Sequence, residues 1–240
     1  MRMIDLNVDL GEGGSRDAEL IALASSANIA CGGHAGDEST MRAAVSVCRK
    51  HGVAVGAHPG YEDREHFGRR DMHLPLGQVA DLVSRQVGRL AAIVRIHHVK
   101  PHGALYNQAD RDPALAAAVV RGVLRVAPGC VFYAPPAGAL ADAAKAAGLT
   151  VHAEGFADRR YQENGALVPR GETGAVIGDV ATAVAQALEI ALRRRAETRG
   201  GPWIPLPART ICVHGDGAEA AALLREIRRA LEAAGFTIRA

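Results

Sequence analysis

Short apolar segments alternate with longer segments of helical periodicity along almost the whole chain. The segments that read as strands are MIDLNVDL, SANIAC, VAVGAH, RIHHVKPH, CVFYAP, TVHAEG and TICVHGD, at 3–10, 26–31, 53–58, 95–102, 130–135, 150–155 and 210–216. Between them, alanine- and leucine-rich stretches with apolar residues three and four positions apart predict helices at 41–52, 76–94, 113–129, 138–148, 180–197 and 218–235. A strand followed by a helix, repeated in this way, predicts an α/β fold with a parallel sheet.

The chain reads as one domain over residues 1–240. Its 240 residues suffice for one α/β barrel, and no linker-like composition divides them. The longest stretch without periodicity, residues 155–177, is long for a loop in a compact domain. We expect a lid or binding loop there, anchored by Phe156, Tyr161 and Leu167, with a disordered surface excursion as the alternative.

Polar residues collect toward the carboxyl ends of the predicted strands. Because alternate residues of a strand share a face, Asp5, Asn7 and Asp9 point the same way, as do Ser26 and Asn28. The polar residues near these ends are Asp9, Asn28, His58, Lys100, His102, Glu154, His214 and Asp216. Ligands of parallel α/β folds bind where the carboxyl ends of the strands meet, so these side chains are candidates for one site.

The segment HHVKPHGALYN, residues 97–107, is the most unusual of these strand ends. His98, Lys100 and His102 share one face of the predicted strand. Removing such charged groups from water costs roughly several kcal/mol unless they form ion pairs, bind a metal or contact water. The segment therefore belongs either to an edge strand with one solvated face or to the mouth of a cavity. The recurrence of polar strand ends favours the cavity.

Composition excludes several classes of function. The formal net charge of +2 gives no general attraction to nucleic acid, and no apolar run is long enough to span a bilayer. The start, MRMIDLNVDLGEGG, does not resemble a signal peptide, so we expect a cytoplasmic protein. The four cysteines form no CxxC pair; Cys31, before Gly-Gly-His, is either a reactive thiol or a packed core residue.

Carboxylates, imidazoles and an amine held together can transfer protons near neutral pH and stabilise a developing negative charge. That chemistry suits hydrolysis or carbonyl activation. The same groups could ligate a divalent metal, for which Asp9, His58 and His102 are the candidates, although no HExxH-type spacing indicates one. The segments GEGGS at 11–15 and CGGHAGD at 31–37 could present backbone N–H groups to an anion, but tight turns are the simpler interpretation.

Six segments resemble the LamB/YcsF family, which includes the A component of the ATP-dependent prokaryotic 5-oxoprolinase. They are DLNVDLGE, SANIACGGHAGD, GAHPGYEDREHFGRR, VKPHGALYN, FADRRYQENGALVPR and ICVHGD, in this order from Asp5 to Asp216. The resemblance implies an irregular seven-stranded (β/α) barrel of the glycoside hydrolase/deacetylase type. Val8, Gly33 and Glu38 depart from the family pattern and put in doubt the shape of the pocket beside His34, and so the substrate range.

The resemblance also implies an activity and partners. The activity is hydrolysis of the lactam of 5-oxo-L-proline to L-glutamate, coupled to ATP hydrolysis, in a complex with subunits B and C. ATP, with Mg²⁺, is the implied cofactor, and the resemblance leaves open whether the nucleotide contacts this chain or mainly its partners. A metal on this chain and a homo-oligomeric state are equally open.

Carried over position by position, the family motifs mark fourteen residues of this chain. We infer catalytic roles for Asp9, His58, Lys100, His102, Glu154, His214 and Asp216, and substrate-binding roles for Glu12, Asn28, His34, Asp37, Asp158, Arg159 and Arg170. In this hypothesis Asp9 or Glu154 is the general base that activates water. Lys100 and nearby histidines stabilise negative charge, and His214, oriented by Asp216, protonates the departing nitrogen.

Two other functions compete with this one. A metal-dependent deacetylase-like hydrolase acting alone would use the Asp9, His58 and His102 set as ligands, by analogy of fold. A non-catalytic subunit that binds a small carboxylated ligand would use the polar ring for recognition only. Metal analysis with chelation discriminates the first, and ligand binding without turnover identifies the second.

Overall fold

Seven parallel strands form a closed barrel in the computed structural model, which describes residues 2–215, 217 and 219–240. In order around the barrel they are β1 (Arg2–Leu10), β2 (Ser26–Ala30), β3 (Ala54–His58), β4 (His98–Val99), β5 (Val131–Ala134), β6 (Thr150–Phe156) and β9 (Thr210–Val213). Strand β9 pairs with both β6 and β1 and so closes the barrel. The predicted seven-stranded α/β barrel is confirmed, strand by strand.

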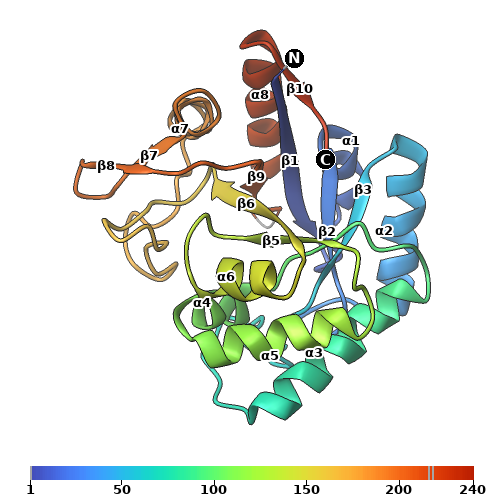
Figure 1. Ribbon diagram of the computed structural model, residues 1–240. Coiled ribbons are helices and arrows are strands. Elements are labelled where there is room, and N and C mark those ends of the chain that lie inside the picture. Colours follow the sequence, from blue (N-terminus) through green and yellow to red (C-terminus); the bar gives the residue numbers. More distant parts are fainter. Residues whose placement is uncertain (1, 216, 218) are drawn as a thin grey trace.

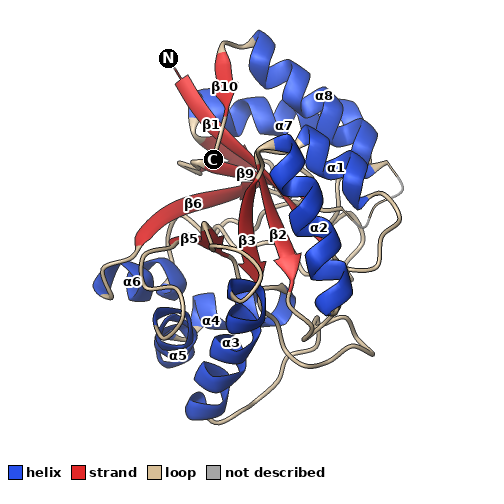
Figure 2. Cartoon of the chain, turned by 90° about the vertical axis from the view of Figure 1, so that its right-hand side faces the viewer, coloured by secondary structure: helices blue, strands red, loops and turns tan. Residues whose placement is uncertain are grey.

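Helices cover the outside of the barrel (Figure 2). They are α1 (Asp17–Leu23), α2 (Glu38–His51), α3 (Leu76–Ala91), α4 (Gly103–Arg111), α5 (Pro113–Leu124), α6 (Ala139–Ala146), α7 (Val180–Arg193) and α8 (Ala220–Ala233). Helix α2 shows why such a segment starts and stops where it does. Asp37 caps its first turn by accepting from the backbone N–H of Thr40, and Gly52 ends it in the left-handed conformation at φ 67°.

The alternation along β1 separates the apolar core from a polar barrel interior. Ile4, Leu6, Val8 and Leu10 are buried in the hydrophobic core, while Asp5, Asn7 and Asp9 point into the barrel. Asp5 accepts hydrogen bonds from Ser25, Ser26, Tyr133 and Thr210, so its buried oxygens have donors on several other segments. The predicted shared face of this strand is therefore the inside of the barrel.

Two predicted elements end earlier than expected. The helix predicted to 197 ends at Arg193, because Arg194 takes the left-handed conformation at φ 56° and the chain turns into a hairpin of β7 (Arg195–Glu197) and β8 (Trp203–Pro205). This hairpin projects from the side of the barrel (Figure 1). The strand predicted over 95–102 is assigned only at His98–Val99, although the N–H groups of Lys100 and His102 still donate to the carbonyls of Ala57 and Pro59.

A short last strand, β10 (Phe236–Ile238), lies beside the start of β1, outside the closed ring (Figure 1). It was not predicted, and neither were α1, α4 or the hairpin. Among the described residues, no helix combines the length and the apolar character that crossing a bilayer requires.

Candidate functional site

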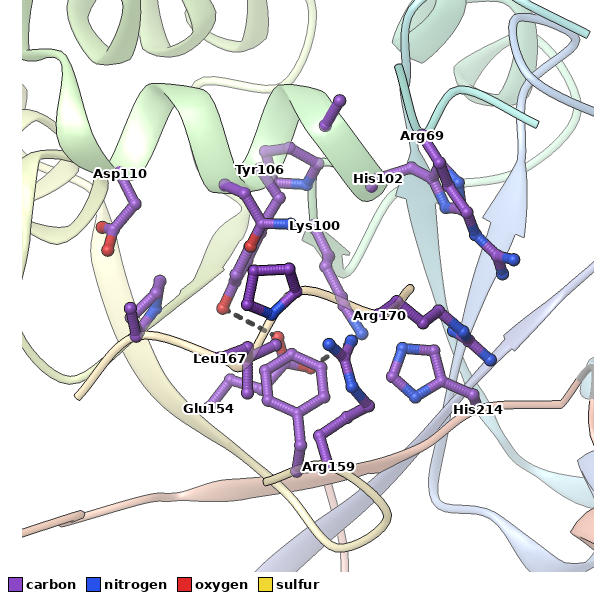
Figure 3. A pocket seen from close by; sticks show the side chains of 18 of the residues that line it. Arg69, Lys100, His102, Tyr106, Asp110, Glu154, Arg159, Leu167, Arg170 and His214 are labelled. Carbon is purple, nitrogen blue, oxygen red and sulfur yellow. Dashed lines mark hydrogen bonds and ion pairs between the residues drawn. The ribbon is translucent and has the colours of Figure 1, made fainter. Parts of the chain in front are cut away.

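A cavity of about 380 Å³ opens at the carboxyl ends of the barrel strands (Figure 3). Helix α4 forms part of its wall, and the irregular loop after β6 forms another part, from Arg159 to Arg170. Of the residues marked from the sequence, the cavity is lined by Asp9, Glu12, His58, Lys100, His102, Glu154, Arg159, Arg170 and His214. The barrel thus brings together side chains from segments far apart in the sequence.

Lys100 lies between two carboxylates at the bottom of this pocket. Its Nζ is 3.0 Å from Oδ1 of Asp9, 2.8 Å from Oε1 of Glu154 and 3.1 Å from Sγ of Cys212. Burial alone would lower the pKa of the Lys100 ammonium, but Asp9, Cys212 and Glu154 raise it well above its usual value. Lys100 is therefore a buried cation at neutral pH.

Glu154 has hydrogen-bond partners on both carboxylate oxygens. Oε1 accepts from Lys100 and, at 3.0 Å, from Nδ2 of Asn7, while Oε2 accepts from the Tyr106 hydroxyl at 3.0 Å. The side chain is 1% exposed. Glu154 is therefore placed to hold Lys100 and Tyr106 in position more than to accept a proton from a ligand.

Asp9 keeps one oxygen turned toward the imidazoles of the pocket. Oδ1 accepts from Lys100 and, at 2.8 Å, from Nδ2 of Asn28, whereas Oδ2 lies 3.5 Å from Nε2 of His58. Burial opposes ionisation of Asp9, but Lys100 and His58 hold its pKa well below its ordinary value. Asp9 is thus ionised at neutral pH, and Oδ2 is the carboxylate oxygen best placed to accept a proton.

Three imidazoles pack together beside Asp9. The rings of His34 and His102 are stacked, with centroids 3.6 Å apart, and His58 lies edge-on to His34 at 5.5 Å and to His102 at 4.8 Å. Burial, and then the neighbouring imidazoles, lower the pKa of His34 and of His102 well below the usual value. These two rings are therefore neutral at neutral pH.

His214 is oriented by Asp158, which the sequence had marked for substrate binding. Nδ1 of His214 lies 2.9 Å from Oδ2 of Asp158, and the same oxygen accepts from the backbone N–H of His214 at 3.0 Å. Burial opposes ionisation of Asp158, but His214 holds its pKa below the usual value. This pairing leaves Nε2 of His214 for a ligand. Asp216, predicted to orient His214, lies outside the described residues.

The loop after β6 is tied down and borders the pocket. Arg159 is buried, and its NH2 group donates to the carbonyl oxygen of Val168 at 2.6 Å. Isolated bridges pair Arg159 with Val176 and Tyr161 with Leu167. Arg159 therefore braces the loop as well as lining the cavity, and Arg170 lies near it at the rim (Figure 3). Of the three expected anchors, Phe156 and Tyr161 are buried, and Leu167 packs against the core.

Some marked residues lie outside the pocket lining. Asn28 is buried beneath it and bonds Asp9, and His34 is buried behind His102. Asp37 is exposed and caps α2, away from the cavity lining, and its inferred contact with substrate stays a prediction. Cys31 is fully buried with its pKa raised by burial to about 12, as expected for a packed core thiol.

Helix α4 contributes residues that sequence reasoning missed. Tyr106 donates to Glu154, and Asp110, whose pKa burial raises to about 6, lines the far side of the cavity from Arg69, Arg170 and His214 (Figure 3). Tyr106 lies in the first turn of the helix that begins directly after His102, and its N–H donates to the carbonyl of His102 at 3.3 Å. Its closeness in sequence to His102 was the available signal.

Gly68 makes room for the stacked imidazoles, and its substitution is a test of their packing. A Cβ on Gly68, at φ +63°, would lie 2.7 Å from Cβ of His34, whereas one on Gly165, at φ +85°, would meet nothing within 4 Å. Both alanine variants carry the left-handed backbone penalty, but only Gly68→Ala adds overlap, so we expect it to lose about 1–3 kcal/mol more stability. Urea unfolding of the two variants measures this difference, and equal losses would show that the imidazoles are not tightly packed.

Comparison with known proteins identifies relatives of the chain. Residues 4–240 match the model of the LamB/YcsF family. A crystal structure of a lactam utilization protein from Thermus thermophilus is similar at a TM-score of 0.93 and 40% sequence identity, covering 99% of this chain and 99% of that chain. The similarity therefore extends over the whole barrel, including the segments that form the pocket.

Two more distant solved structures share the fold. A family 4 carbohydrate esterase from Streptomyces lividans is similar at a TM-score of 0.52 and 16% identity, covering 99% of this chain and 91% of that chain. A deacetylase, T48, is similar at a TM-score of 0.52 and 14% identity, covering 99% of this chain and 87% of that chain. At such identities the likeness shows a deacetylase-type barrel and no more.

Proposed function

The chain belongs to the LamB/YcsF family, and from this membership and the geometry of the pocket we propose that it opens the lactam ring of 5-oxo-L-proline to give L-glutamate. The reaction is ATP-dependent and takes place in a complex with partners that correspond to 5-oxoprolinase subunits B and C. The single observation that carries the proposal is the ionised Asp9, paired with Lys100 and lining the cavity beside His58. The Thermus relative described as a lactam utilization protein supports the same class of substrate.

The substrate carboxylate binds toward the side of the pocket that carries Arg170 and His214. Arg69 and Arg159 add positive charge there, and a guanidinium group matches a carboxylate in shape (Figure 3). This orientation leaves the lactam carbonyl toward Asp9 and Lys100. A cavity of about 380 Å³ is ample for a five-membered ring with one carboxylate.

In the proposed reaction, Asp9 accepts a proton from the water that attacks the lactam carbonyl carbon. Nζ of Lys100 lies within hydrogen-bond distance of Asp9, Glu154 and Cys212, and its positive charge stabilises the negative charge on the phosphorylated lactam oxygen. His214, held by Asp158, donates a proton from Nε2 to the departing ring nitrogen. The ring C–N bond breaks, and the product carries a new carboxylate and an amine.

ATP is the second substrate, and we propose that the partner subunits bind most of it. The glycine-rich segments at 11–15 and 31–37 form turns: the N–H of Gly11 donates to Asp17 and that of Gly32 to the carbonyl of Ala35. These amides are used within the turns, so they give little support to a phosphate cradle. Transfer of the terminal phosphoryl group of ATP to the lactam oxygen in the assembled complex would release ADP and make the carbonyl carbon easier to attack. Opening of the ring would then give an acyl phosphate, and a second water would hydrolyse it to the carboxylate and inorganic phosphate.

Reconstitution tests the proposal. The chain is co-purified with its candidate partners, and glutamate release from 5-oxoproline is measured with and without ATP. We expect release only when this chain, the partners and ATP are all present. Glutamate formation by the partners alone would refute the proposal. Binding of 5-oxoproline by the complete mixture without turnover would favour a non-catalytic carboxylate-binding subunit.

A further inference from the structure

Four side chains of metal-ligand type converge at the wall of the pocket, and three of them line it. One ligand atom from each of Glu12, His34, His58 and His102 lies within 4.8 Å of the others. Glu12 follows β1, His34 follows β2, His58 ends β3 and His102 follows the short β4. The cluster is therefore made by four consecutive strands of the barrel, and no local sequence spacing could show it.

Backbone carbonyls fix which nitrogen of two rings carries a proton. Nδ1 of His58 lies 2.8 Å from the carbonyl oxygen of Lys100, and Nε2 of His102 lies 2.9 Å from that of Phe67. A carbonyl oxygen only accepts, so these two ring nitrogens donate. Nδ1 of His102 is then a lone pair in its neutral ring, and it faces Nε2 of His58 at 3.0 Å.

The carboxylates around these two nitrogens can only accept. Oδ2 of Asp9 lies 3.5 Å from Nε2 of His58, and Oε1 of Glu12 lies 3.5 Å from Nδ1 of His102. Glu12 Oε1 is also 3.2 Å from Nε2 of His34, whose Nδ1 is buried without a hydrogen-bond partner among the described residues. Acceptors that converge in a buried place need a cation or an added proton between them. A backbone carbonyl behind a ring is also the usual support of a metal-bound histidine.

We propose that Glu12, His34, His58 and His102 form a binding site for a divalent transition-metal ion. Three imidazoles and one carboxylate suit Zn²⁺, Co²⁺ or Ni²⁺, whereas Mg²⁺ and Ca²⁺ prefer oxygen ligands. The set differs from the Asp9, His58 and His102 candidates inferred from the sequence, because the ligand atoms that lie within 4.8 Å of one another come from Glu12 and His34 as well as the two histidines, and not from Asp9. When bound, such an ion would lower the pKa of a coordinated water.

Metal titration of the isolated full-length chain tests this site. The chain is stripped with a chelator, and Zn²⁺ and Co²⁺ are added separately, with bound metal counted by elemental analysis and Co²⁺ followed by its visible absorption. We expect one equivalent per chain, and a loss of affinity of about 100-fold or more in His34→Gln and in His102→Gln, since even groups behind the ligands are worth about 10–100-fold. His51→Gln, which replaces an exposed histidine at the end of α2, is the matched control and should bind as the unaltered chain does.

Two results would overturn the site. The first is that the unaltered chain binds Zn²⁺ and Co²⁺ no more tightly than the His34→Gln variant does. The other is one equivalent retained at full affinity by both His34→Gln and His102→Gln, with circular dichroism showing native folds. Should those variants fail to fold, Glu12→Gln at the half-buried edge of the cluster gives the same comparison. No ATP, lactam or partner subunit enters the titration, so its outcome is independent of the proposed function.

Discussion

Asp9→Asn is expected to lower ATP-dependent glutamate formation by about 10²–10⁴-fold, the usual contribution of a general base. The substitution removes the proton-accepting Oδ2 beside His58 but keeps a carbonyl oxygen that can accept from Lys100 and Asn28. Because Glu154 still neutralises Lys100 at 2.8 Å, the barrel should stay folded. The measurement is the initial rate of glutamate release by the reconstituted complex, with circular dichroism of the isolated variant.

The matched control for this result is Asp71→Asn. Asp71 also lines the cavity, but its side chain is 59% exposed and its ion pair with Arg111 is long, at 3.8 Å. Exposed pairs of this kind contribute little, so activity should change less than about threefold. A folded Asp9→Asn variant with near-normal turnover would remove Asp9 from the role of base and leave Glu154 as the carboxylate to test.

Lys100→Met is expected to be the most destabilising substitution at the site. It leaves Asp9 and Glu154 buried side by side without their shared cation, and breaking a buried pair in this way costs about 3–5 kcal/mol. In the native chain the pKa of Asp9 is held well below its ordinary value of 3.8. Its pairing with Lys100 therefore stabilises the fold fully at pH values above 3.8. This stabilisation is lost as the pH falls through the lower pKa of the folded chain. The difference in unfolding free energy between the two proteins should therefore be largest at neutral pH and shrink in acid.

A double variant separates the effect of the Lys100 charge on stability from the effect of its side-chain packing. Adding Glu154→Gln to Lys100→Met removes one of the two stranded carboxylates, so the double variant should recover part of the lost stability at pH 7. Urea unfolding at several pH values gives all the free energies needed. A loss that is the same at every pH, or no recovery in the double variant, would mean that Lys100 acts through its apolar stem and not through its charge.

The barrel was predictable because its strands and helices carry regular periodicity. In β1 the alternation of Asp5, Asn7 and Asp9 with apolar residues already separates the inside of the barrel from its core-facing outside. The elements that were missed are short. Helix α1 has 7 residues and β10 has 3, lengths over which the hydrophobic pattern contains too few repeats to stand out from a loop.

Which residues form the site was easier to predict than which of them contact one another. Strand ends gave Asp9, Lys100, Glu154 and His214, but nothing in the sequence could show that Asp158 lies against His214, because that contact crosses between the segments after β6 and β9. The alternation of residues along the strand likewise predicted that His102 points toward the pocket. Its stacking on His34 depends on how the loops after β2 and β4 meet, which the sequence does not show.

A crystal structure of Asp9→Asn soaked with 5-oxo-L-proline tests the central claim most directly. The account predicts that the lactam ring lies in the cavity at the carboxyl ends of the strands, with its carbonyl toward residue 9 and Lys100 and its carboxylate toward Arg170 and His214. A ligand bound with its carbonyl away from residue 9 and Lys100, or bound elsewhere on the chain, would contradict it.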